Sequence, residues 1–120
     1  MEMKIAAEAL AALALEGRLA VFRLLVQAGP EGVKAGDIAL ALGAPASTLS
    51  ANLAVLSHAG LIEGRREGRS IRYSARYEQM RALIAFLLED CCNGAPEICV
   101  PLMEIASRAA CCESSRKPVQ

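Results

Sequence analysis

The stretch that decides the fold runs from residue 43 to residue 73 and reads GAPASTLSANLAVLSHAGLIEGRREGRSIRY. Its first half predicts a helix from about Pro45 to His58. Proline suits the first helical turn, because its fixed φ fits the helix and its missing N–H is not needed there. Leu49, Leu53 and Leu56 then recur at helical spacing and form one apolar stripe, which we expect to be buried.

The second half of the stretch changes its period from that of a helix to that of a strand. Leu61–Arg65 and Ser70–Ser74 are typical of two short strands. We expect residues 66–69 to form the turn of a hairpin, in which Gly68 is available for a positive φ. The hairpin therefore follows the helix directly.

The flanking segments predict further helices, because apolar residues recur along them at spacings of three and four. The 120 residues suffice for one domain and are too few for two of ordinary size. We therefore expect a single domain over residues 1–112 and a disordered tail over 113–120. The additional helices are predicted up to about Leu15, from Arg18 to Ala28, from Lys34 to Leu42, from Glu78 to Cys92 and from Val100 to Cys112.

The order of helix, tight turn, helix and hairpin is that of a winged helix-turn-helix. Only Gly43 and Ala44 separate the third and fourth predicted helices, and so short a joint forces a sharp crossing. The fourth helix can then project into the major groove of double-stranded DNA. We predict a mainly α protein with a small β-hairpin, in which the wing lies between the fourth and fifth helices.

Two sets of residues are candidates for DNA contact. Short side chains on the recognition helix, opposite its leucine stripe, would let the backbone approach base edges, where Asn, Ser and Thr can hydrogen-bond. Arginines on the hairpin could reach a minor groove or the phosphates. Each feature alone is also typical of an ordinary solvated surface, and it is their succession that favours DNA. The candidates are Ser47, Thr48, Ser50, Ala51 and Asn52 on the helix, with Arg65, Arg66 and Arg69 on the hairpin.

The charge distribution agrees with a local binding face. The formal net charge is zero, so the chain as a whole is not a polybasic protein. Between Leu61 and Arg81, however, six arginines stand against three glutamates. We expect any attraction to nucleic acid to come from this segment.

The run from Gly43 to Tyr73 resembles the ArsR/SmtB family of metal- and metalloid-sensing repressors, and the similarity covers about residues 5–90. The resemblance implies a homodimer joined by its first and last helices, binding to operator DNA, and release when a ligand binds. Two departures stand out. Many members have His where Ala51 and Asn52 stand. Many arsenic sensors carry Cys-Val-Cys-Asp on the third helix, where this chain has Ala35-Gly36-Asp37 and no cysteine.

All five cysteines lie in the last third of the chain. The loop from Asn93 to Ile98 can fold back at modest entropic cost, so Cys91, Cys92 and Cys99 could converge as three sulfurs. Their pattern, DCC followed by PEIC, resembles the ArsR members whose arsenite site is C-terminal. Three thiolates suit As(III), which forms a neutral adduct and needs no compensating base, and the neighbouring Glu89, Asp90 and Glu97 supply none.

Other chemistry at these cysteines stays open. Soft thiolates also select cadmium or lead, particularly if Cys111 or Cys112 joins, whereas zinc usually takes four ligands and would leave an anionic site. A disulfide between Cys99 and one of the earlier pair would make a redox switch, although acidic neighbours favour the neutral thiol. A DNA-binding protein without a small ligand is a further alternative.

Enzymatic function finds no support in the sequence. The chain has a single histidine, His58, no Ser-His-Asp set, no phosphate-binding loop and no Cys-x-x-Cys motif. The apolar run 11–15 is too short for a membrane span and has the wrong flanks for a signal peptide. We therefore expect a cytoplasmic protein without a membrane partner.

Overall fold

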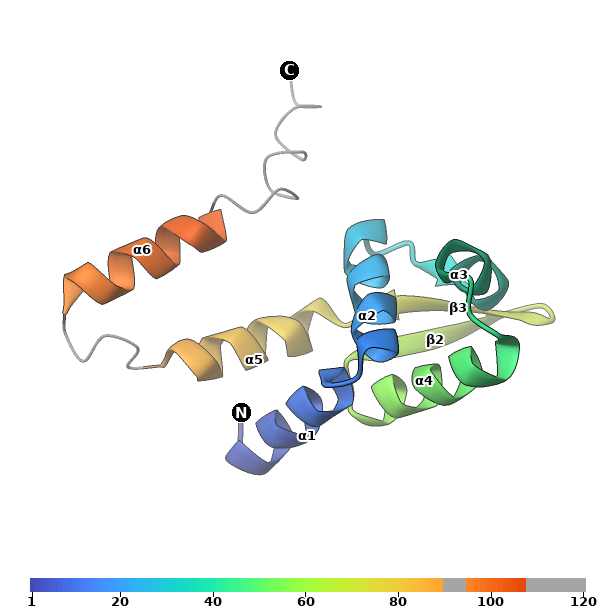
Figure 1. Cartoon of the computed structure of the whole chain (residues 1–120), viewed down its shortest axis with the longest axis horizontal. Coiled ribbons are helices and arrows are strands. Elements are labelled where there is room, and N and C mark those ends of the chain that lie inside the picture. Colours follow the sequence, from blue (N-terminus) through green and yellow to red (C-terminus); the bar gives the residue numbers. More distant parts are fainter. Residues whose placement is uncertain (90–94, 108–120) are drawn as a thin grey trace, which may run out of the picture. The chain divides into compact units, whose positions relative to one another are not determined.

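The computed structural model describes residues 1–89 and 95–107, and over them the chain is mostly helical with one small sheet (Figure 1). The three strands form an antiparallel sheet in the order β1-β3-β2. This confirms the predicted mainly α fold with a hairpin between the fourth and fifth helices. The elements are α1 (Met3–Leu13), α2 (Glu16–Ala28), β1 (Val33–Lys34), α3 (Ala35–Leu42), α4 (Ala46–His58), β2 (Ile62–Glu67), β3 (Ser70–Ala75), α5 (Tyr77–Leu88) and α6 (Pro96–Ser107).

The chain divides into two compact units, Met1–Phe86 and Leu87–Gln120. The first holds the sheet and the helices α1 to α4 together with most of α5. The second holds α6, which contains Pro101 and exposes Ile98, Val100 and Ile105. The single domain expected over residues 1–112 stays a prediction, as does the disordered tail, because residues 108–120 lie outside the described ranges.

The core of the first unit forms where α2 and α4 meet the sheet. Leu25 of α2, Ile38 of α3 and Leu56 of α4 are fully enclosed. The predicted leucine stripe of α4 is confirmed, since its other two members are also buried. On α1 the buried face consists of Ala6, Ala9 and Ala12, and alanine lets two helices approach closely because it carries no side chain beyond Cβ.

The hairpin is tighter than the sequence analysis expected. Glu67 pairs with Ser70, so the turn holds only Gly68 and Arg69. The prediction of a four-residue turn over 66–69 is wrong, because Arg66 and Glu67 continue β2. Gly68 takes a φ of 62°, as expected, and such a left-handed residue is what a two-residue hairpin turn requires.

Strand β1 was not anticipated. Its two residues pair with β3, Val33 with Tyr73 and Lys34 with Arg72. A strand of two residues is too short to show an alternating pattern, so periodicity could not reveal it. β1 begins after Gly32, which has a φ of 77°. Gly32 lies so close to the backbone of Tyr73 that an added Cβ would collide with its carbonyl oxygen.

Four helix boundaries within the described residues differ from the predictions by two residues or more. α1 ends at Leu13 rather than at about Leu15. α2 begins at Glu16, two residues early, where an acidic side chain suits the positive N-terminal end of the helix. α6 begins at Pro96 rather than Val100, because proline is well placed in a first turn. α5 ends at Leu88, before the predicted Cys92, and carboxylates such as Glu89 disfavour a helix C-terminus.

Among the described residues no single helix is long and apolar enough to cross a membrane. The pair α3 and α4 meets the length and composition criteria only when its members are taken together, and it is sharply bent at the break between them.

Candidate nucleic-acid interface

The helix-turn-helix is built from α3 and α4, which are bent by 115° at their short break. Gly43 ends α3 in the left-handed conformation, and its N–H donates to the carbonyl oxygen of Ala39. Pro45 then takes an extended conformation and precedes the first turn of α4. The angle lies within the range typical of this motif, so the sharp crossing expected from the two-residue joint is confirmed.

α4 presents a small, polar face to solvent. Ser47, Thr48, Ser50 and Ala51 are all exposed. No side chain caps the N-terminus of the helix, so backbone N–H groups of its first turn remain available to an acceptor such as a phosphate. These four residues lie outside the buried leucine stripe, as the sequence predicted, and their contact with DNA stays a prediction.

Asn52 does not belong to that face. Its side chain is only 8% exposed, and its Nδ2 atom lies 3.1 Å from where a Cβ on Gly17 of α2 would stand. The prediction that Asn52 lies on the exposed face is therefore wrong. Helical spacing predicts that Asn52 is buried, because it stands three residues after Leu49 and four before Leu56, within the buried stripe.

The hairpin arginines divide into two groups. Arg65 donates from Nη2 to the carbonyl oxygen of Glu31 at 3.5 Å, and Arg72 donates from Nη1 to that of Gly32 at 3.3 Å. Arg72 also contacts both carboxylate oxygens of Glu67 at 3.1 Å. Because Arg65 and Arg72 are paired across the two strands, these contacts hold two neighbouring guanidinium groups beside the loop before β1.

The second group remains available to a ligand. Arg66 and Arg69 are exposed, and within residues 1–89 and 95–107 neither makes a side-chain hydrogen bond or an ion pair. The hairpin that carries them extends past α3 and α4 to its tip (Figure 1). Of the three predicted wing arginines, only Arg65 makes a side-chain hydrogen bond within the described residues, and the contact of all three with DNA stays a prediction. The internal role of Arg72 was missed, because the sequence gives no sign of the loop carbonyl beside it.

We call α3, α4 and the wing hairpin of β2 and β3 the reading head. Tyr77 joins the start of α5 to α2, which packs against this reading head. Its hydroxyl donates to the carbonyl oxygen of Val26 at 2.8 Å, near the end of α2. A helix leaves its last carbonyl groups without intrahelical partners, so this bond satisfies one of them and fixes the start of α5 against α2.

The predicted cysteine site falls largely outside the described residues. Cys91 and Cys92 lie in the range 90–94, and Cys111 and Cys112 lie in 108–120. Cys99 stands in the first turns of α6, is partly buried and is disulfide-bonded. Within the described ranges no group of three or more His, Cys, Asp or Glu side chains could hold a metal ion. The three-sulfur site therefore stays a prediction.

Comparison with known proteins gives one family. Residues 16–65 match the model of a helix-turn-helix domain, a span that runs from α2 into β2. The HTH-type transcriptional regulator YgaV of Escherichia coli is 35% identical over 82 residues, which are 68% of this chain and 81% of YgaV. The ArsR-like transcriptional regulator of Rhodococcus sp. RHA1 is 26% identical, with a TM-score of 0.64 over 86% of this chain and 93% of its own.

A third similar protein is Mb0332 of Mycobacterium bovis, a homodimeric winged helix-turn-helix DNA-binding domain described as a possible ArsR-family regulator. It is 34% identical, with a TM-score of 0.57 over 73% of this chain and 82% of its own. The chain belongs to the ArsR family of winged helix-turn-helix transcriptional regulators. As an ArsR-family member it is a DNA-binding regulator of transcription, and the relatives it matches are regulators rather than enzymes.

Proposed function

We propose that the chain represses transcription as a homodimer on double-stranded operator DNA and is released when As(III) binds Cys91, Cys92 and Cys99. Ser47, Thr48, Ser50 and Ala51 face base edges or phosphates in the major groove, while Arg66 and Arg69 carry the wing contacts. Support comes from the exposure of all six residues and from the absence, within residues 1–89 and 95–107, of side-chain partners for the two arginines.

Support for the homodimer comes from apolar side chains that the first unit leaves in solvent. Met3 is 72% exposed on α1, Leu10 on the same helix is 42% exposed, and Ile84 on α5 is 48% exposed. Large exposed apolar side chains gathered on two helices are typical of a surface that a partner covers. The homodimeric state of Mb0332 agrees with this proposal.

The proposal that As(III) is the inducer rests on the position of the five cysteines. None occurs before residue 91, so the reading head has no sulfur ligand and thiol chemistry is confined to the segment beyond α5. Three thiolates neutralise As(III) and bind it without further charge. An allosteric coupling of about 1–3 kcal/mol, or roughly 5–150-fold in DNA affinity, would be enough to release a promoter.

The test is fluorescence anisotropy of a labelled fragment of the gene's own promoter, titrated with reduced protein. Arsenite, cadmium, lead and peroxide are then added separately. We expect arsenite to release the DNA, and the single variants Cys91→Ser, Cys92→Ser and Cys99→Ser to keep binding DNA without responding. A double variant, Cys111→Ser with Cys112→Ser, is the matched control and should respond like the parent. Release from the triple serine variant would disprove the site.

Thiol oxidation is the second candidate, and the disulfide at Cys99 favours it. In this version a bond between Cys99 and a second cysteine changes the affinity for DNA. Peroxide would then release the promoter fragment, and dithiothreitol would restore binding. Mass spectrometry of the released protein separates the candidates, since oxidation removes two hydrogens from a thiol pair whereas arsenite adds arsenic. Release by cadmium or lead but not by arsenite would indicate a wider thiolate site that includes Cys111 or Cys112.

A further inference from the structure

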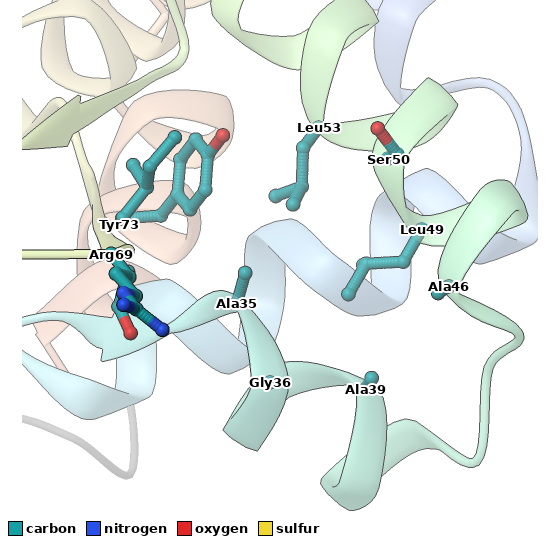
Figure 2. A pocket seen from close by; sticks show the side chains of 11 residues that line it. Ala35, Gly36, Ala39, Ala46, Leu49, Ser50, Leu53, Arg69 and Tyr73 are labelled. Atoms are coloured by element: carbon teal, nitrogen blue, oxygen red, sulfur yellow. The ribbon is translucent and has the colours of Figure 1, made fainter. Parts of the chain in front are cut away.

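A cavity of about 400 Å³ opens between α3, α4 and β3, inside the first unit (Figure 2). Leu49 and Leu53 of α4 point across it toward Ala35 and Tyr73. Ligand pockets in proteins typically have this size and combine apolar walls with a few polar groups. The lining residues are Ala35, Gly36, Ala39, Ala46, Leu49, Ser50, Leu53, Arg69, Ser70, Ile71 and Tyr73.

Small residues on the α3 side keep the space open. Ala35, Gly36 and Ala39 follow one another along the helix face that borders the cavity. A Cβ added at Gly36 would meet no atom within 4 Å, so a side chain at this position would collide with nothing at its Cβ.

The polar groups on the lining favour an anion. They are three hydroxyl-bearing residues and the guanidinium of Arg69, and the lining includes no carboxylate. Arg69 has no acidic partner in the part of the chain that the structure describes. Ala46 also lines the cavity, at the uncapped N-terminus of α4, where the helix dipole favours negative charge.

We propose that this cavity binds a small apolar carboxylate, with the hydrocarbon part among the alanine and leucine side chains and the carboxylate facing Arg69. Ser50 and Arg69 line the cavity and are also two of the residues assigned to DNA. An occupied cavity therefore competes with the operator for the same groups. This gives the regulator a second release signal, located in the reading head and independent of the cysteines.

Octanoate and 1-octanol form a matched pair of probes, because they share the chain and differ in the charge of the head. Methyl NMR spectra of the full-length reduced protein are recorded during titration with each. We expect octanoate to give saturable shifts at the methyls of Ala39 and Leu53. Gly36→Leu should abolish them by filling the cavity, while Ala41→Leu, which introduces a leucine at an exposed α3 position outside the lining, should not.

Two further variants test the charge. Arg69→Gln should weaken octanoate binding roughly tenfold and leave 1-octanol binding unchanged. Arg66→Gln removes a neighbouring wing charge that does not line the cavity, and it should change neither. Should Gly36→Leu lose its dispersed spectrum, Ala39→Leu takes its place. In the anisotropy assay, octanoate should lower the promoter affinity of the triple cysteine-to-serine variant.

Three results would overturn the proposal. They are an absence of saturable shifts up to millimolar octanoate, shifts that persist in both cavity-filling variants, and equal binding of octanoate by the parent and Arg69→Gln. Octanoate that binds but leaves promoter affinity unchanged would overturn the competition with DNA. None of these results bears on the arsenite response, which the cysteine variants test separately.

Discussion

Two glycines with similar backbone angles should respond very differently to the same substitution. Gly32 has a φ of 77° and Gly68 a φ of 62°, so alanine at either position is forced into the left-handed region, at about 1–2 kcal/mol. At Gly68 the added Cβ would meet nothing within 4 Å, whereas at Gly32 it would collide with the carbonyl oxygen of Tyr73.

The collision adds a second cost at Gly32. The neighbouring atoms there are backbone and the Cβ of Ser74, 3.2 Å away, so no flexible side-chain end can move aside. Overpacking of this kind typically costs about 1–3 kcal/mol. We therefore expect Gly32→Ala to lower the free energy of unfolding by about 2–5 kcal/mol, and Gly68→Ala to lower it by about 1–2 kcal/mol.

Urea denaturation followed by far-UV circular dichroism measures both values. The reasoning is refuted if both variants lose the same stability. Equal losses would mean that backbone strain alone sets the cost and that the approach of residue 32 to β3 contributes nothing.

Three further predictions concern the reading head and its support. Arg66→Ala should weaken promoter binding and lower the slope of log affinity against log salt concentration by about one per arginine removed. Arg76→Ala removes a charge already paired with Glu63 of β2 and should change that slope less; anisotropy titrations at several salt concentrations compare the two variants. Tyr77→Phe removes the hydrogen bond to α2 and should cost about 1 kcal/mol in urea denaturation; an unchanged midpoint would contradict this. Leu56→Ala should cost about 2–5 kcal/mol because the side chain is fully buried, whereas Leu40→Ala, at a position 82% exposed, should stay within about 0.5 kcal/mol of the parent.

Helical and strand periodicity predicted those features of the fold that depend on long, regular patterns. The leucines of α4 fixed which side of the recognition helix is buried, and the break at Gly43 and Ala44 fixed the sharp angle to α3. Features that depend on one or two residues were missed. β1 exists because Gly32 permits a close approach to β3, and that approach is a tertiary contact without a periodic signature.

Composition predicted which segment is basic, whereas side-chain contacts could not be predicted, and contact of the candidate residues with DNA stays a prediction. Counting arginines identified the wing as the basic segment, but it could not tell which arginines are occupied internally. Asn52 was placed by its polar character, although its spacing from Leu49 and Leu56 put it beside Gly17 in the packed side of α4. The predicted three-sulfur site rests on the sequence alone, because Cys91 and Cys92 lie outside the described residues.

The division of the arginines shapes how this regulator can recognise DNA. The chain has no net charge, and contacts with Glu67, Glu63 and the loop before β1 engage Arg72, Arg76 and Arg65. Carboxylates therefore offset the charges of Arg72 and Arg76, whereas a carbonyl contact leaves the charge of Arg65 in place. In the proposed function, phosphate attraction from the wing rests on Arg65, Arg66 and Arg69, a small electrostatic contribution. Discrimination between operators would then come largely from hydrogen bonds and close approach at α4. A ligand that engages Arg69 in the proposed cavity would remove one of these three charges from each subunit of the proposed homodimer, so the cavity would be a sensitive position for control.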